Sequence, residues 1–153
     1  MLDNLTVSAL ARLSRLGVIR RRQRVEEGRR LIGETRVHAP GLAAPISALS
    51  GGNQQKVLLG RLLAKKPRVL VLNDPMRGVD LGAKQDIYDI LRRFAASGGG
   101  VLLLSTELAE LCLLCDRVAV FHDQALNAVV ERQRLAAPAL IAAMFGQPEE
   151  VSA

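Results

Sequence analysis

The residues best suited to bind a ligand are Ser50, Gly51 and Gly52, which stand directly before a segment of helical periodicity, residues 53–66. Glycine lets a backbone approach a ligand closely. The free N–H groups and the positive end of the dipole at a helix start favour a phosphate. Ser50 adds a hydroxyl donor. The same residues could also form an ordinary helix cap after a loop, so a phosphate site and a simple cap both stay open.

A second candidate lies where the apolar run 68–73 ends in Asn73, Asp74 and Pro75. In open α/β sheets, ligands bind beyond the carboxyl ends of the parallel strands. Asp74 therefore stands where a carboxylate could take part in ligand chemistry. It could also close an Asx-turn before Pro75, because aspartate commonly starts turns.

Periodicity predicts the elements that must position these residues. We expect helices at 5–17, 20–36, 53–66, 82–96, 107–115 and 138–145, with a hairpin of strands 117–122 and 126–131. The apolar runs 68–73 and 101–105 are typical of strands buried on both faces of a parallel sheet. This order predicts an α/β fold. We divide the chain into a helical part (1–50), a core (51–135) and a C-terminal helix with a tail (136–153).

Composition excludes several classes of protein. Of the 153 residues, 49% are hydrophobic, which excludes general disorder, and 3% are aromatic, which argues against a protein that stacks nucleic-acid bases. The arginines near the start could form a nucleic-acid or membrane-surface patch, but their helical spacing favours solvated helix faces.

Cys112 and Cys115 lack a second pair to complete a zinc site, and we expect them to pack as small apolar residues. No apolar run reaches about 18 residues, so we expect no membrane span.

Together the motifs resemble the ATP-binding subunits of ABC transporters, and most closely the second nucleotide-binding domain of monosaccharide importers of the ribose/galactose type. LSGGNQQK (49–56) resembles the ABC signature, and VLVLNDPMRGVDLGAK (69–84) resembles the Walker B strand with the D-loop. LLLSTELAEL (102–111) is similar to the switch region, and DRVAVFHDQAL (116–126) to the strand that follows it. The resemblance implies a partial P-loop NTPase (ABC ATPase) fold, with a helical subdomain before a parallel-strand core that lacks the Walker A portion.

The resemblance also implies roles for single residues. Two domains of this family bind ATP between them head to tail, so Ser50, Gly51 and Gly52 would bind the γ-phosphate of ATP held by another domain. Asp80 matches the D-loop aspartate, which meets the opposite subunit. We expect Gln54 and Lys56 to stabilise their helix or to face solvent.

The hydrolytic positions depart from the family pattern. Asn73 stands where the family has the aspartate that holds Mg²⁺ through water, and an amide brings no charge to that hard cation. Asp74 replaces the catalytic glutamate and is one methylene shorter. Thr106 stands at the position of the switch histidine. The position of Gln124 in this turn usually holds glycine in the family, so we expect the turn to be less favourable in energy here.

No Gly-x-x-x-x-Gly-Lys-Ser/Thr motif occurs in the 153 residues, so we expect the chain to need another nucleotide-binding domain that supplies Walker A. The resemblance implies ATP and Mg²⁺ as cofactors, permease subunits as further partners and no nucleic acid. It implies a cytoplasmic protein, peripheral on the inner face of the cell membrane. The expected function is that of the C-terminal part of an ATP-binding subunit that couples ATP binding and hydrolysis to sugar import.

Two alternatives remain beside this function. One is a non-catalytic remnant or regulatory module that docks with ABC subunits. The other is a chromosome-maintenance or DNA-repair ATPase, since these also carry an LSGG motif. The run from Arg77 to Lys84 favours the transporter over the second alternative.

Overall fold

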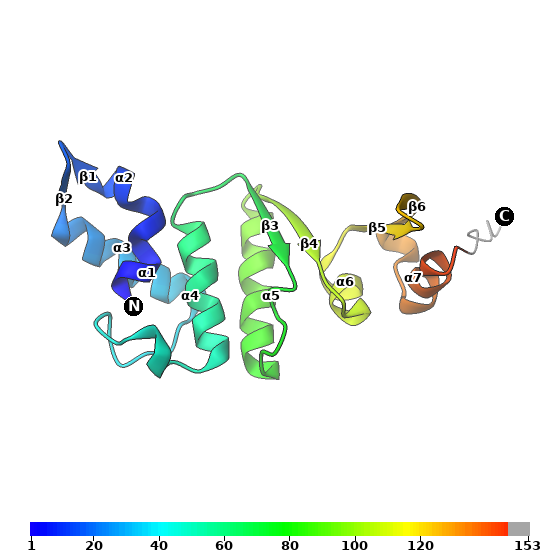
Figure 1. The fold of residues 1–153 in the computed structure, drawn as a ribbon, viewed down its shortest axis with the longest axis horizontal. Helices are drawn as coiled ribbons and strands as arrows, with labels where there is room; N and C mark the ends of the chain where they lie inside the picture. The colour runs from blue at the N-terminus through cyan, green and yellow to red at the C-terminus, as the bar shows by residue number, and fades with distance from the viewer. Residues whose placement is uncertain (147–153) are drawn as a thin grey trace. The chain divides into compact units, whose positions relative to one another are not determined.

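Helices and strands alternate along the chain largely as the periodicity predicts (Figure 1). The structure is a computed structural model that describes residues 1–146, so the tail predicted beyond residue 146 lies outside the described residues. The chain divides into two units, residues 1–102 and 103–153. The elements are α1 (Leu2–Thr6), η1 (Val7–Ala9), α2 (Leu10–Leu13), β1 (Ser14–Arg15), β2 (Val18–Ile19), α3 (Arg21–Thr35), η2 (Ile46–Ala48), α4 (Gly51–Leu63), β3 (Val69–Asn73), α5 (Leu81–Ala96), β4 (Gly100–Leu104), α6 (Leu108–Leu114), β5 (Arg117–His122), β6 (Ala125–Glu131), η3 (Arg132–Arg134) and α7 (Ala137–Met144).

The single helix predicted over 5–17 is wrong, because this segment breaks into α1, η1, α2 and the short hairpin β1–β2. The Thr6 hydroxyl donates to the carbonyl of Leu2 at 2.8 Å, a local bond that competes with a regular helix. Leu16 (φ 52°) and Gly17 (φ 79°) then form the turn of the hairpin in left-handed conformations. The predicted stop at Gly17 is thus a strand turn rather than a helix end.

Helices α1, α3 and α4 form the core of the first unit. Leu5, Leu31 and Val57 are almost fully buried in it. At Gly60 a β-carbon would lie 2.9 Å from Cδ2 of Leu5, so the missing side chain lets α1 approach α4. The predicted helices 20–36 and 53–66 are therefore confirmed as α3 and α4, with shifts of one to three residues at their ends.

Strands β3 and β4 pair in a two-stranded sheet, and α5 connects them. The prediction that their apolar runs are buried on both faces is wrong. Leu70 and Leu72 are buried in β3, whereas Val69 and Val71 are 58% and 65% exposed. Leu72 lines a small cavity with residues of α4 and α5, so the buried face of β3 points to these helices. The opposite face is open to solvent in the described part of the first unit.

The second unit packs the hairpin β5–β6 against α6 and α7. Its core contains Leu111, Val120, Val130, Leu140 and Ala143. The two cysteines are partly buried and pack against this core, and burial raises the pKa of the Cys115 thiol. Asp123 (φ 47°) and Gln124 (φ 63°) form the hairpin turn, so the glycine-like conformation expected at Gln124 is present.

Candidate nucleotide-phosphate site

Helix α4 begins with a side-chain cap at Ser50. The Ser50 Oγ accepts hydrogen bonds from the backbone N of Asn53 at 3.4 Å and from its Nδ2 at 3.0 Å. Asn53 Oδ1 in turn accepts from the backbone N of His38 at 2.8 Å, and Gln54 Nε2 donates to the carbonyl of Leu49 at 2.8 Å. The cap interpretation is confirmed, and Gln54 stabilises the start of the helix as expected. A capping hydroxyl still keeps its own proton to donate.

The two glycines of this segment have different surroundings. A β-carbon on Gly51 would meet no atom within 4 Å, and Gly51 is exposed. A β-carbon on Gly52 would lie 2.4 Å from Cβ of Ala83 and 3.1 Å from Oδ2 of Asp80. Gly52 is therefore required for the close packing of α4 on the start of α5, whereas Gly51 leaves its backbone open to a ligand.

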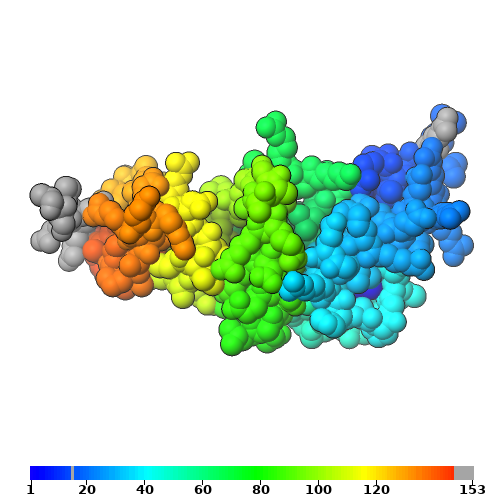
Figure 2. Space-filling view, turned by 180° about the vertical axis from the view of Figure 1, so that it is seen from behind, coloured from blue at the N-terminus to red at the C-terminus, as the bar shows by residue number. Residues whose placement is uncertain are grey.

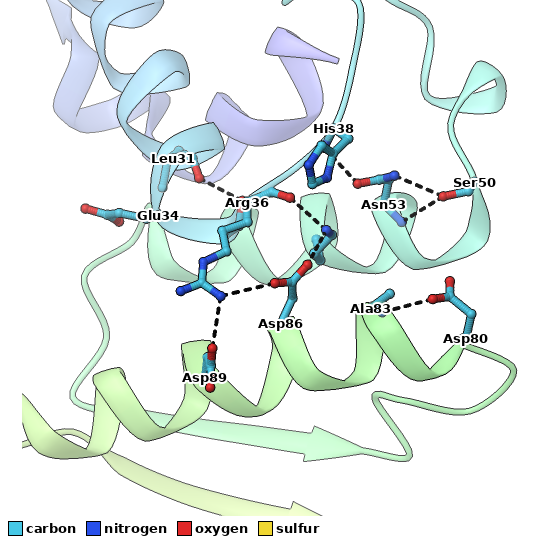
Figure 3. A network of polar contacts seen from close by, with 12 residues as sticks. Leu31, Glu34, Arg36, His38, Ser50, Asn53, Asp80, Ala83, Asp86 and Asp89 are labelled. Atoms are coloured by element: carbon cyan, nitrogen blue, oxygen red, sulfur yellow. Dashed lines mark hydrogen bonds and ion pairs between the residues drawn. The ribbon is translucent and has the colours of Figure 1, made fainter.

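Asp80 caps α5, because its Oδ1 accepts from the backbone N of Ala83 at 2.9 Å. Figure 3 shows Asp80 and Ser50 at the same end of two neighbouring helices. The structure thus brings Asp80 together with Gly52, two sequence motifs that are separated by most of α4 and all of β3. Asp80 itself remains exposed.

At the end of β3, Asn73 is exposed and Asp74 is half-buried. Asp74 adopts a left-handed conformation (φ 42°), and its carbonyl accepts from the N of Arg77 at 3.2 Å, which closes a turn. Within residues 1–146 no three His, Cys, Asp or Glu side chains gather into a potential metal site. Asn73 is neutral, so it brings no charge to a cation at this position.

Thr106 is exposed and precedes α6 in the second unit. Its neighbour Ser105 donates from Oγ to Oε2 of the buried Glu110 at 2.7 Å and accepts from the N of Glu107 at 3.1 Å. These bonds fix the turn into α6.

One residue close to the site was not expected from the sequence. Lys56 was expected to stabilise its helix or face solvent, but it is 2% exposed. Its Nζ donates to the carbonyl of Arg36 at 2.7 Å and to Oδ2 of Asp86 at 2.9 Å. A lysine in a polar stretch normally lies at the surface, and no local signal identifies a partner thirty residues away.

Neighbouring contacts strengthen this junction. The Arg36 guanidinium contacts Asp86 at 3.2 Å and Asp89 at 2.9 Å. Figure 2 shows α3 (light blue) and α5 (green) side by side at the surface, where Arg93 also donates to the carbonyl of Glu34 at 3.0 Å. Burial opposes ionisation of Asp86, but hydrogen bonds from Lys56 and Arg36 outweigh it, so the pKa of Asp86 is lowered. The start of α4 therefore rests on a charged, hydrogen-bonded junction of three helices.

None of the helices within residues 1–146 has the length and apolar character needed to cross a bilayer.

Known proteins resemble this chain in sequence. No protein-family model matches it. The ribose import ATP-binding protein RbsA 2 of Rubrobacter xylanophilus is 42% identical over 94% of this chain and 28% of its own length. The ribose import ATP-binding protein RbsA 1 of Burkholderia cenocepacia is 46% identical over 79% of this chain and 23% of its own length. The chain thus spans less than a third of these relatives.

Solved structures show the same fold at lower identity. An ATP-binding cassette of an ABC transporter, MJ1267, matches with a TM-score of 0.74 and 19% identity, covering 93% of this chain and 61% of the cassette. The dimeric cassette MJ0796, bound to ADP and Pi, matches with a TM-score of 0.71 and 18% identity over 86% of this chain and 56% of its own. The predicted α/β fold is confirmed as part of the ABC ATPase fold. Over most of its length the chain is thus similar in sequence to ribose import ATP-binding proteins, and its fold is that of part of an ABC ATPase cassette.

Proposed function

We propose that this chain works as part of the ATP-binding subunit of an ABC sugar importer, and that the start of α4 binds the γ-phosphate of ATP held by another ATP-binding domain. The observation that carries this proposal is the contrast between Gly51 and Gly52. Gly52 fixes α4 against α5, while Ser50 and Gly51 stay exposed on the fixed helix start.

The start of α4 offers what a phosphate requires. The first N–H groups of a helix have no acceptor within the helix, and the helix dipole adds about half a positive charge there. The first turn of α4 holds no acidic side chain that would repel an anion. Ser50 Oγ contributes a hydroxyl donor beside these N–H groups. A phosphate presented by another domain would therefore meet several preoriented donors.

The partners and setting follow from the relatives. Their names describe ATP-binding proteins of ribose import, and the solved cassette MJ0796 is a dimer bound to ADP and Pi. We infer a second ATP-binding domain that supplies the phosphate loop, permease subunits that carry the sugar, and a place on the inner face of the membrane. We infer that Mg²⁺ comes with the ATP held by that other domain, because the neutral Asn73 would bind a hard cation more weakly than a carboxylate would.

A non-catalytic docking role is the second candidate, and Asn73 is the observation that favours it. A neutral amide in place of a carboxylate weakens the hydrolytic position without changing the start of α4. The two candidates differ in ATP turnover and agree in ATP-dependent association, so association is the property to test first.

Ser50→Asp separates the cap from the phosphate role, because aspartate caps a helix as well as serine does but its charge repels a phosphate. We expect the unchanged chain to associate with an intact ATP-binding cassette only when ATP is present, as measured by analytical ultracentrifugation. Ser50→Asp should keep its unfolding midpoint and lose this association. Ser47→Ala, at an exposed serine of η2, is the matched control and should behave as the parent.

We also expect the chain without a cassette to bind ATP weakly or not at all in a calorimetric titration. ATP-dependent association that Ser50→Asp leaves intact would contradict the phosphate role of α4. Micromolar binding of ATP by the chain alone would contradict the need for a second domain.

A further inference from the structure

A lysine buried among three helices has no part in the function described above. The side chain of Lys56 is 3% exposed, and its ammonium lies between the carbonyl of Arg36 and the carboxylate of Asp86. Removing a charged group from water is unfavourable unless good partners replace the water. The two bonds of its Nζ, at 2.7 and 2.9 Å, provide such partners. The ammonium therefore has a defined direction that a surface lysine would lack.

The partners of Lys56 come from the two helices beside α4. Arg36 follows α3 in a left-handed conformation (φ 51°) and gives its carbonyl to Lys56 and its guanidinium to Asp86. Asp86 lies on α5 and accepts from both cations. Arg36, Lys56 and Asp86 thus close a ring that joins the end of α3, the second turn of α4 and the first half of α5.

Two contacts run along the same interface between α4 and α5. Gly52 and Lys56 are four residues apart on α4, and Ala83 and Asp86 are three residues apart on α5, so each pair shares one helix face. The contact of Gly52 with Ala83 sets how closely the helices approach. The ion pair of Lys56 with Asp86, at 2.9 Å, lies one turn further along both helices.

We propose that Lys56 is a positioning residue for the phosphate-binding start of α4. Through Asp86 and the carbonyl of Arg36 it fixes the rotation of α4 on α5, and with it the direction in which Ser50 and Gly51 face. That this orientation of Ser50 and Gly51 serves phosphate binding rests on the proposed function, whereas the orientation of α4 itself can be measured without a nucleotide. An apolar pair of similar size would hold α4 and α5 together but would not fix the rotation of α4 on α5.

The test measures a distance between the two helix starts. Spin labels are placed at Gly51→Cys, where no atom crowds the new side chain, and at Gln85→Cys, which is exposed on α5. The native cysteines are replaced by Cys112→Ser and Cys115→Ser. In this background the variants are Lys56→Met, the double variant Lys56→Met/Asp86→Leu, and the control Lys65→Met at an exposed lysine just beyond α4.

We expect a single narrow distance distribution in the parent and in Lys65→Met. Lys56→Met should broaden it and lower the unfolding midpoint, because Asp86 loses its buried partner. Replacing both charges by apolar groups should recover much of the stability while the distribution stays broad. A parent-like narrow distribution in either folded Lys56 variant would show that Lys56 only stabilises the fold, and would overturn the proposal.

Association of unlabelled Lys56→Met, with Gly51 unchanged, with an intact cassette in the presence of ATP separates this proposal from the proposed function. A broad distribution together with weakened association supports both. A broad distribution with unchanged association supports the positioning of α4 by Lys56 and contradicts the phosphate role of that helix start.

Discussion

The start of α4 and the end of β3 both lie where ligand chemistry is expected, and they are built differently. At the start of α4, Ser50 caps the helix, Gly52 packs on α5 and Lys56 joins three helices. At the end of β3, Asn73 is an exposed neutral amide and Asp74 sits in a left-handed turn. Under the proposed function, the first region would bind a phosphate held by another domain, and the second, with a neutral Asn73, would be weakened for hydrolysis. We therefore expect ATP-dependent association and ATP turnover to depend on separate parts of this chain.

The largest effect should come from adding one methyl group to each glycine of the signature. In Gly52→Ala the new Cβ would lie 2.4 Å from Cβ of Ala83, and such overpacking costs about 1–3 kcal/mol of unfolding free energy. Gly51→Ala meets no neighbour and should keep or raise stability, since alanine favours a helix over glycine by roughly 1 kcal/mol. Urea unfolding measures both.

Ala83→Gly serves as the control for this contact. Combined with Gly52→Ala it removes the clash, so the two changes should cost less together than the sum of their separate costs. Equal destabilisation by Gly51→Ala and Gly52→Ala would mean that the two glycines do not differ as the structure indicates.

A smaller effect should appear when the hydrolytic positions are restored. We propose joining the preceding part of the Rubrobacter xylanophilus relative to residue 1 and comparing ATPase rates with and without Asn73→Asp/Asp74→Glu. The added charge and the longer reach should raise the rate tenfold or more, or about 1.4 kcal/mol of transition-state stabilisation. If the ATPase rate is already fast and the two substitutions leave it unchanged, then Asn73 and Asp74 support hydrolysis as well as the family's usual residues do.

Much of this arrangement could be predicted from local sequence. The strand 68–73, the helix 82–96 and the hairpin across Asp123 and Gln124 are confirmed, because their periodicity and turn residues are strong local signals. The helix 5–17 failed because local bonds of Thr6 and the turn at Gly17 override its apolar spacing.

The tertiary contacts of the site could not be predicted. Nothing near Lys56 in the sequence indicates that Asp86 and the carbonyl of Arg36 will surround it. Likewise, the different roles of Gly51 and Gly52 depend on Ala83, which belongs to another helix. The sequence indicates which residues are candidates for binding a phosphate, but the packing of α5 determines which of them stay accessible.

The smallest expected effect is a loss of unfolding free energy at low pH, which arises from contacts at the C-terminal end of α4. Glu27 accepts from Arg30 at 2.8 Å and from Arg12 at 2.5 Å, and Arg12 also donates to the carbonyl of Ala64, where α4 ends. The hydrogen bond from Arg30 is the largest influence on the pKa of Glu27 and lowers it. Burial raises this pKa, and the hydrogen bond from Arg12 lowers it further, so that it falls from an ordinary 4.5 to about 2. A lowered pKa stabilises the folded state above about pH 4.5, and this stability is lost as the pH falls toward about 2.

We therefore expect the unfolding free energy to fall over that range, with Glu27 contributing roughly 1 kcal/mol because solvent screens the two half-exposed arginines. Glu27→Gln should flatten this part of the pH profile, as followed by thermal unfolding at each pH. Glu26→Gln, at an exposed glutamate of the same helix, should leave it unchanged. Identical pH profiles of unfolding free energy for the parent and Glu27→Gln would show that the charge of Glu27 does not stabilise the fold around the end of α4.

The most direct measurement places a paramagnetic ion next to the proposed phosphate. The isotope-labelled chain is mixed with an unlabelled intact ATP-binding cassette that holds ATP with Mn²⁺, and the broadening of each backbone amide signal is recorded by NMR. We expect the amides of Gly51, Gly52 and Asn53 to broaden most, and Ser50→Asp to abolish this effect. Strongest broadening elsewhere, or equal broadening with and without the cassette, would contradict the binding of another domain's nucleotide by the start of α4.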